Sequence, residues 1–338
     1  MTYQGGPDSR QIKKRRALPA IREARFLYTR ALVLNAPHDL AVTRLSIAEP
    51  GAADVVVDTM WSGVSTGTER LLYTGLMPTF PGMGYPLVPG YEGVGRVRWA
   101  GDAAGVDVGA TVFVPGANCY GAVRGLFGAN ASTVVLPGAR VVPIDPAMGE
   151  LGTLMALAAT AQHALASPNV LPDLIIGHGV VGRLLARLTV MHGGAAPTVW
   201  ETNPVRCGGA QGYPVVHPSA DDRRDYRAIY DASGDASLLD TLVMRLAPAG
   251  EIVLAGFYHE RMGFAFPMAF MKEARFRIAA QFKRADLDVV AAAMASGRLD
   301  LGGLITNHAN ANDAPDAYRT AFDDAHCLKM ILDWRAAA

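Results

Sequence analysis

The chain has 338 residues, half of them apolar, and its 31 Lys and Arg residues balance 31 Asp and Glu residues. This length predicts two domains of ordinary size, each with enough apolar residues to form a core. The balanced charge gives no support to nucleic-acid binding, the three well-separated cysteines are typical of reduced cytosolic thiols, and no apolar run approaches the roughly 18 residues of a membrane span.

Residues 1–25 differ from the rest of the chain. The segment is basic, contains Gly and Pro, and lacks the apolar core of a signal peptide. We interpret it as a disordered extension. A sharper alternative is a polybasic contact with an anionic membrane surface, which would add a peripheral membrane association to a cytoplasmic protein.

The first half, residues 26–150, is predicted to be rich in β-structure. Short β-branched and apolar runs predict strands at 31–34, 54–58, 94–99, 110–114 and 132–136. Residues 61–92 are rich in Gly, Pro and aromatic residues and predict long loops. The run 151–166 is apolar except near its end, and we expect it to form a buried helix that joins two domains.

From residue 151 the pattern changes to alternating strands and helices. The expected order is strand 173–176, helix 180–191, strand 198–200, strand 228–231, helix 235–246, strand 251–255 and strand 275–281. This alternation predicts a doubly wound parallel sheet, and thus an α/β fold. The tail returns to mixed structure, with helices at 286–296 and 315–322 and a strand at 328–332.

The most informative motif is G-x-G-x-x-G at 177–182, which lies between an expected strand and an expected helix. Gly177 allows the tight turn, Gly179 lets the backbone approach a pyrophosphate, and Gly182 lets the helix pack close to the strand. The helix begins at Val180 and Val181, and its unpaired N–H groups and positive dipole favour phosphate binding. The motif in this context predicts a dinucleotide site.

Glu201 ends the next expected strand and follows the glycine motif by about 20 residues, the usual spacing of the ribose-binding acid. A carboxylate there accepts hydrogen bonds from both ribose hydroxyls and repels a 2′-phosphate, which predicts NAD rather than NADP. The alternative is a strand-terminal glutamate in a cofactor-free α/β fold.

Over about residues 26–335 the chain resembles the medium-chain dehydrogenase/reductase superfamily. The matching landmarks are 63–69, 89–95, 160–165, the glycine motif and 329–332. The resemblance implies a GroES-like β-barrel catalytic domain over 26–150, a Rossmann NAD-binding domain over 151–283, and a return to the catalytic domain over 284–338.

The departures from the superfamily concern zinc. Zinc-dependent relatives carry a cysteine where Ser65 stands and a histidine where Tyr91 stands, and their third ligand would fall within 154–158, which holds no Cys, Asp or Glu. The four-cysteine structural zinc lobe is also absent from the sequence. Because a catalytic zinc needs three protein ligands, we predict that this chain binds no metal.

A closer resemblance is to the bacteriochlorophyllide a dehydrogenases of phototrophic bacteria. It is carried by the runs 60–75, 77–92, 199–204, 254–258 and 327–334. This family oxidises the 3-(1-hydroxyethyl) group of a magnesium tetrapyrrole to 3-acetyl with NAD, late in bacteriochlorophyll a synthesis. The resemblance implies the same reaction here, and a membrane contact would then be with the photosynthetic membrane.

Oxidation of a secondary alcohol removes a hydride and a proton, and without zinc the proton must pass through hydrogen-bonding groups. Tyr91 and Ser65 stand at the vacated ligand positions. Thr66 or Thr68 matches the proton-relaying hydroxyl of zinc relatives, and the sequence leaves that choice open. His163 is a candidate base, but a histidine on an apolar helix is more often a satisfied core residue.

Further residues carry a binding role and a structural alternative. By resemblance Thr160 approaches the nicotinamide, and its alternative is packing within its helix. Arg206, five residues after Glu201, is a candidate to stack on adenine or else a surface arginine. Lys329 is a candidate to reach the pyrophosphate or else forms a salt bridge at a strand start. A Pro/Gly-rich loop offers an apolar surface for a flat substrate, or is anchored by buried aromatics; its residues are Met77, Phe80, Met83 and Tyr85.

Two other functions stay open at this point: a zinc-less quinone or enoyl reductase, and a non-catalytic nucleotide-binding protein. Residues 274–282 read as the last strand of the cofactor sheet. Unpaired strand edges invite pairing, and in the superfamily this edge commonly joins two subunits. We therefore predict a symmetric homodimer.

Overall fold

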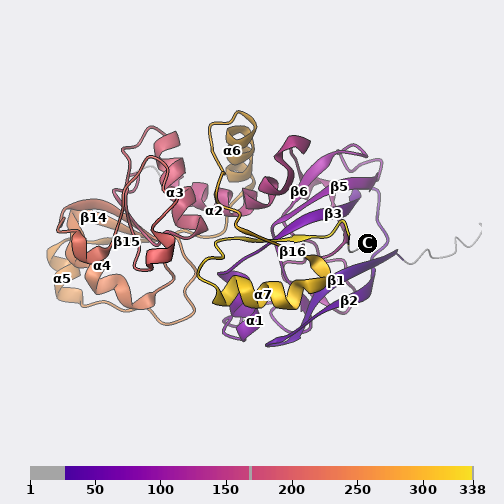
Figure 1. The fold of residues 1–338 in the computed structure, drawn as a ribbon, viewed down its shortest axis with the longest axis horizontal. Coiled ribbons are helices and arrows are strands. Elements are labelled where there is room, and N and C mark those ends of the chain that lie inside the picture. Colours follow the sequence, from indigo (N-terminus) through magenta and orange to yellow (C-terminus); the bar gives the residue numbers. More distant parts are fainter. Residues whose placement is uncertain (1–26, 167–169, 337–338) are drawn as a thin grey trace, which may run out of the picture.

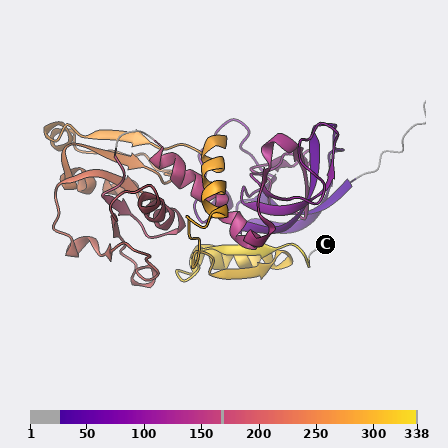
Figure 2. The ribbon, with the colours of Figure 1, turned by 90° about the horizontal axis from the view of Figure 1, so that it is seen from above.

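The computed structural model describes residues 27–166 and 170–336, so the expectation for the basic segment 1–25 lies outside the described residues. Two lobes lie side by side, with helices α2 (Met155–Leu165) and α6 (Arg284–Ala295) between them (Figures 1 and 2). No helix of the described residues is long and apolar enough to cross a membrane.

The first lobe is a β-barrel built from two sheets. In the described chain one sheet has the order β2-β1-β4-β7, and the other has the order β16-β17-β3-β5-β6-β9 with β8 paired to β3. The bounds of its strands are β1 Leu27–Ala36, β2 Asp39–Ile47, β3 Asp54–Val64, β4 Leu87–Val88, β5 Gly93–Ala100, β6 Thr111–Val114, β7 Arg124–Gly125, β8 Thr133–Pro137, β9 Val142–Pro143, β16 Asn307–Asn310 and β17 Met330–Asp333. Buried valines on facing strands fill its interior, which explains why β-branched runs form these strands.

The second lobe is a parallel sheet with the order β12-β11-β10-β13-β14-β15. Its strands are β10 Leu174–Ile176, β11 Thr198–Trp200, β12 Val215–Val216, β13 Tyr226–Asp231, β14 Leu246–Leu254 and β15 Arg275–Ile278; its helices are α3 Val180–Met191, α4 Leu239–Arg245 and α5 Phe266–Met271. The chain runs outward from β10 to β12 and then resumes on the other side of β10 at β13. Ligands of such sheets bind where the strand order reverses, beyond the carboxyl ends of the strands.

The C-terminal segment returns to the barrel. After α6 the chain forms β16, helix α7 (Ala314–Asp323) and β17, and β17 pairs antiparallel with β3, Met330 opposite Val64. Figure 1 shows this segment in yellow, with α7 beside the indigo strands of the first lobe. The fold is therefore the GroES-like barrel plus Rossmann α/β arrangement that the sequence predicts.

The expectation of long loops over 61–92 was wrong in part. β3 continues to Val64, and helix α1 occupies Thr68–Thr74 and ends at Gly75 in the left-handed conformation. The helix escaped prediction because it is only seven residues long and glycines flank it on both sides. The strand β2, the short strands β4, β7, β9, β12 and β16, and the helix α5 were also not predicted.

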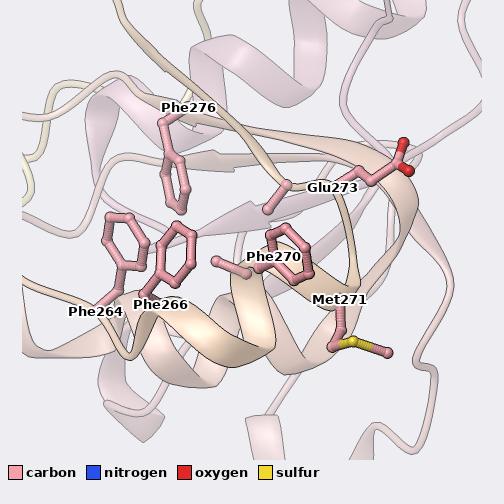
Figure 3. A pocket seen from close by; sticks show the side chains of 8 residues that line it. Phe264, Phe266, Phe270, Met271, Glu273 and Phe276 are labelled. Atoms are coloured by element: carbon pink, nitrogen blue, oxygen red, sulfur yellow. The ribbon is translucent and has the colours of Figure 1, made fainter.

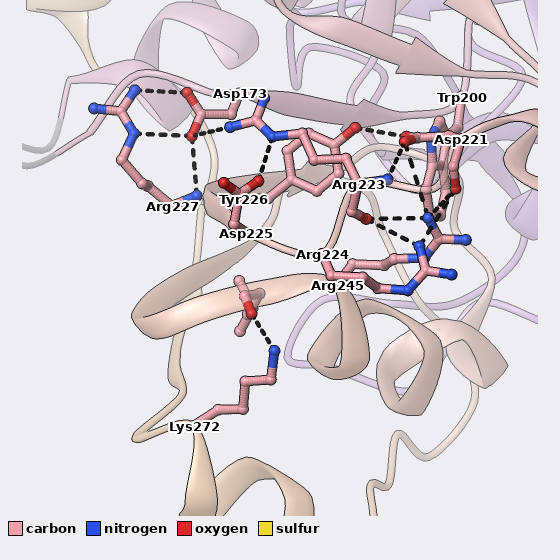
Figure 4. A network of polar contacts seen from close by, with 11 residues as sticks. Asp173, Trp200, Asp221, Arg223, Arg224, Asp225, Tyr226, Arg227, Arg245 and Lys272 are labelled. Atoms are coloured by element: carbon pink, nitrogen blue, oxygen red, sulfur yellow. Dashed lines mark hydrogen bonds and ion pairs between the residues drawn. The ribbon is translucent and has the colours of Figure 1, made fainter.

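A network of arginines fastens the connection between β12 and β13 to the Rossmann sheet (Figure 4). Asp173 accepts from Arg227 at 2.6 and 3.0 Å, and Asp221 accepts from the Trp200 indole at 2.6 Å. The guanidinium of Arg245 lies 4.8 Å from the Trp200 ring centroid. These contacts hold the strand that ends in Trp200 and so fix the residue that follows it, Glu201.

Candidate active site

The glycine loop has the geometry that a dinucleotide requires. Gly177 has a φ of +92°, which favours glycine, and a Cβ on Gly182 would collide with the carbonyl oxygen of Gly177. A Cβ on Gly179, by contrast, would meet nothing within 4 Å, so the backbone there is open to an approaching group. No side chain caps the N-terminus of α3, which begins at Val180, and its first N–H groups remain available to an anion.

Glu201 lies beside this loop. Its carboxylate accepts the backbone N–H of His178 at 3.0 Å and that of Asn203 at 2.8 Å. Glu201 is half-buried, and each of its carboxylate oxygens accepts one of these N–H groups, which leaves lone pairs for a further donor. The structure thus brings the predicted ribose-binding acid next to the predicted phosphate loop.

Arg206 follows on a short helical turn, Pro204–Arg206. Its guanidinium donates to the carbonyl oxygen of Ala325 at 3.3 Å, so it contacts the C-terminal segment across the two lobes. Its own carbonyl oxygen accepts from His178 and Arg183. Arg206 is half-buried, and its role toward adenine stays a prediction.

The hydroxyl groups predicted for proton handling form one cluster in the barrel. The hydroxyls of Ser65 and Tyr91 are 2.7 Å apart, and Thr68 Oγ1 lies 3.5 Å from the Tyr91 hydroxyl. The ring of Tyr91 packs edge-on against Phe127. Burial raises the pKa of Tyr91, with a smaller contribution from Glu92, so Tyr91 is a hydrogen-bond donor and not a base at neutral pH. Of the two threonine candidates, Thr68 is the one whose hydroxyl contacts this cluster.

The residues at the third zinc-ligand position, Leu154 to Ala158, are buried and apolar. Among the residues that the structure describes, no group of three or more His, Cys, Asp and Glu side chains could hold a metal ion. Metal independence of the reaction stays a prediction.

Beneath the hydroxyl cluster lie two carboxyl groups that the sequence reasoning missed. Glu69, 1% exposed, accepts from the Ser65 N–H at 3.0 Å, from Asn130 at 3.0 Å and from the hydroxyl of Tyr318. Burial raises the pKa of Glu69 to about 7. The second group, Glu92, is fully buried, and burial raises its pKa against the opposing effect of a neighbouring ammonium.

That ammonium belongs to Lys329, which is buried and forms an ion pair with Glu92. Its Nζ also donates to the carbonyl oxygen of Val64 at 3.0 Å. The expectation that Lys329 reaches a pyrophosphate is therefore corrected: the structure contains the alternative, a salt bridge at the start of β17. Glu92 is the ion-pair partner of this ammonium, and moving Lys329 away would leave the buried Glu92 carboxylate without a counter-charge.

Two predicted residues lie on α2 and make structural contacts. His163 Nδ1 is 2.9 Å from Asp286 on α6, and this contact satisfies the half-buried imidazole. Thr160 Oγ1 donates to the carbonyl oxygen of Ala156 at 2.9 Å. The structure does not bring His163 into the hydroxyl cluster, which favours its core alternative. Thr160 is half-buried, and its role toward nicotinamide stays a prediction.

The predicted substrate loop divides into buried and exposed parts. Met77 is 8% exposed and packs with Met83, Tyr85 and the leucines around β4. The Tyr85 hydroxyl donates to the carbonyl oxygen of Leu72 at 2.5 Å. Met77 is thus a buried anchor of the loop and not a free surface for substrate, and of the four residues Phe80 remains the exposed one, at 39%.

The barrel, the parallel sheet and the glycine loop define the class of this protein, a medium-chain alcohol dehydrogenase. Residues 51–146 match the family described as "Alcohol dehydrogenase GroES-like domain". The chain is 57% identical over 316 residues to 2-desacetyl-2-hydroxyethyl bacteriochlorophyllide A dehydrogenase of Cereibacter sphaeroides, covering 92% of this chain and 99% of the relative. The protein of the same name from Rhodobacter capsulatus is 55% identical, covering 91% and 99%. The chain belongs to this family of bacteriochlorophyllide a dehydrogenases.

Solved structures with the same fold are more distant in sequence. L-idonate 5-dehydrogenase from Escherichia coli has a TM-score of 0.79 at 18% identity, covering 91% of this chain and 98% of its own. An E. coli alcohol dehydrogenase in complex with NADH has a TM-score of 0.77 at 22% identity, covering 90% and 99%. A zinc-binding dehydrogenase from Sinorhizobium meliloti bound to NADP has a TM-score of 0.76 at 19% identity, covering 91% and 99%. The fold accepts either nicotinamide cofactor, so the choice rests on residues of this chain.

Proposed function

We propose that this protein oxidises the 3-(1-hydroxyethyl) group of a bacteriochlorophyllide to a 3-acetyl group with NAD. The observation that carries the proposal is the identity of 57% over almost the whole chain to a relative named for a hydroxyethyl bacteriochlorophyllide. The carbinol carbon of such a substrate is attached to a conjugated macrocycle. Positive charge that develops there on hydride loss is delocalised, which lowers the need for a Lewis acid.

The hydroxyl cluster carries the proton chemistry of this proposal. The Tyr91 hydroxyl donates to the reacting oxygen, and Ser65 and Thr68 hold that hydroxyl in place. Because burial raises the pKa of Tyr91, the phenol stays protonated and donates to the developing alkoxide, in the manner of an oxyanion hole. The alcohol proton leaves through the neighbouring hydroxyls to solvent water as the hydride leaves carbon, each hydroxyl releasing one proton as it accepts another. No metal ligand is needed in this arrangement.

Glu201 selects the cofactor. When bound, NAD supplies the hydride acceptor, and the glycine loop with the open N-terminus of α3 holds its phosphates. The carboxylate of Glu201 accepts from the ribose hydroxyls and disfavours a 2′-phosphate by charge repulsion.

A turnover assay tests the reaction. The purified protein is mixed with NAD and either a 3-hydroxyethyl or a 3-vinyl bacteriochlorophyllide, and NADH absorbance is followed. We expect NADH only with the hydroxyethyl substrate, together with the acetyl product. Reduction of a quinone or an enone by NADPH, without oxidation of the hydroxyethyl substrate, would assign the chain to the reductase alternative.

We also propose that the enzyme is a symmetric dimer joined at β15. This strand lies at the edge of the parallel sheet, and Ile278 on it is 78% exposed. Phenylalanines from α5, from β15 and from the segment before α5 line an adjacent apolar pocket (Figure 3). The ring centroids of Phe264 and Phe276 lie 4.6 Å apart in a stacked arrangement. Met271 beside it is 73% exposed. Unpaired strand edges and apolar surface of this kind are usually covered by a partner.

Sedimentation of the protein and of an Ile278→Asp variant tests the dimer. The native protein should sediment as a dimer at micromolar concentration and the variant as a folded monomer. A native monomer would contradict the proposal.

A further inference from the structure

His178 is the second residue of the glycine motif, and the dehydrogenase chemistry leaves it unused. Its side chain is fully buried. Nδ1 lies 2.7 Å from the carbonyl oxygen of Arg206, and Nε2 lies 2.9 Å from the hydroxyl of Tyr213. The backbone N–H of the same residue donates to Glu201 at 3.0 Å. One residue therefore joins the phosphate loop, the ribose-binding acid and the segment that follows it.

These partners define the state of the imidazole. A carbonyl oxygen only accepts, so Nδ1 carries the proton and Nε2 accepts from the Tyr213 hydroxyl. Burial lowers the pKa of His178 to about 4, and the nearby Arg183 and Arg187 lower it against the opposing effect of Glu201. The ring is therefore neutral and uses both nitrogens throughout the physiological pH range.

Arg183, one turn into α3, reinforces the same connection. Its guanidinium donates to the carbonyl oxygen of His178 at 3.0 Å, to that of Arg206 at 3.1 Å and to that of Gly208 at 2.8 Å. Gly209 packs against it with a φ of +79°, where a Cβ would crowd the guanidinium. The segment 204–213 is thus held by two side chains that belong to the glycine loop and its helix.

We propose that His178 is a positioning and specificity-determining residue for the dinucleotide, which locks Glu201 and Arg206 against the glycine loop. This inference rests on the proposed role of the loop as an NAD site. Without the imidazole, the carbonyl oxygen of Arg206 loses one of its two donors and Tyr213 loses its acceptor. Of the two side chains that hold the segment 204–213, only Arg183 then remains, and Arg206 loses its fixed position. The backbone N–H of residue 178 still donates to Glu201, so Glu201 loses its alignment indirectly, through the segment that follows it.

The test compares His178→Ala, His178→Asn and Tyr213→Phe, with His192→Ala as the matched control. His192 lies at the far end of the same helix, where it bonds Gln162. Asparagine keeps an N–H donor near the position of Nδ1, and phenylalanine removes only the hydroxyl bond to Nε2. Dissociation constants for NAD and NADP, kcat at saturating NAD, and melting temperatures are measured for each variant.

For His178→Ala we expect NAD affinity to fall about tenfold, the value of one lost hydrogen bond of ordinary strength, and the preference for NAD over NADP to fall by a similar factor. kcat at saturating NAD should stay within about twofold, since the site of chemistry lies in the other lobe. His178→Asn should recover part of the affinity, and His192→Ala should match the native protein. In protein labelled with ¹⁵N-histidine, NMR should show that the His178 ring carries its proton on Nδ1 and does not titrate above about pH 5.5.

Three results would overturn the inference. NAD affinity that is unchanged in a folded His178→Ala variant removes the positioning role. If the native protein prefers NAD and His178→Ala loses the same factor of affinity for NAD and for NADP, His178 does not determine specificity. A ring that titrates near its ordinary pKa shows that the two bonds do not persist. If the native protein prefers NADP, the proposal of NAD as the cofactor is wrong. The positioning role of His178 is then tested by the NADP affinity of the same variants.

Discussion

Replacement of Glu69 by glutamine should make the stability of the protein less dependent on pH. The carboxyl group is 1% exposed, and burial raises its pKa from the ordinary 4.5 to about 7. A carboxyl with a raised pKa in the folded state binds its proton more tightly there than in the unfolded chain. Its favourable contribution is fully present below pH 4.5 and is lost as the pH rises through about 7.

The size of the effect follows from the two pKa values. They differ by about 2.5, and each unit corresponds to about 1.36 kcal/mol, so ionisation of Glu69 costs the folded state about 3.4 kcal/mol above pH 7. Glutamine keeps the shape and an acceptor for the Ser65 N–H, and it cannot ionise. It should therefore be close to native stability at about pH 5, and more stable than the native protein by about 2 to 3 kcal/mol at about pH 8.5.

The assay is the free energy of unfolding in urea at both pH values, for the native protein, Glu69→Gln and the exposed control Glu49→Gln. At each pH the free energy of unfolding of the native protein is subtracted from that of the variant. The change in this difference between the two pH values cancels the titration of all other groups. The control should show no such change. If this double difference for Glu69→Gln is below about 1 kcal/mol, or has the opposite sign, the reasoning from burial is refuted.

Three further predictions concern the chemistry. Tyr91→Phe keeps the ring and should lower kcat roughly 10²- to 10³-fold, about 2–4 kcal/mol, with little change in NAD affinity; near-normal kcat in the steady-state assay would move the donor role to Ser65 or Thr68. Glu201→Ala should lower kcat/KM with NAD and improve it with NADP, and equal use of both cofactors by the native protein would contradict the assignment. Exhaustive chelation should leave kcat unchanged, with no stoichiometric zinc in elemental analysis; one tight zinc per chain whose removal abolishes activity would refute metal independence.

The sequence predicts those features that depend only on residues close together in the chain. The strands, the helix after the glycine loop and the three glycines follow from periodicity and from backbone geometry over a few residues. What it does not reveal are pairings between distant residues. The sequence leaves Lys329 open to a phosphate or to a salt bridge, and the fold places Glu92 against it. The sequence favours a core role for His163, and the fold places Asp286 of α6 2.9 Å from its Nδ1.

The missed residues share one physical feature, a polar group among apolar or glycine-rich neighbours. Glu69 follows a run of small hydroxyl residues, and His178 stands inside a glycine turn. Such a group must find its partners elsewhere in the chain, and pattern alone does not say where. A polar residue inside a motif of otherwise small residues is thus the signal that could have found both.

The pairing of β17 with β3 has a consequence for the order of folding during synthesis. Lys329 and Val64 bond each other 265 positions apart, so the ribosome makes the whole Rossmann lobe before the barrel receives its last strands. Until then β8 pairs with the first half of β3, the stretch Trp61–Val64 lacks its partner strand, and Glu92 has no counter-charge. We expect the nascent barrel to remain incomplete until β17 is made, while the second lobe folds from contacts that are closer in sequence.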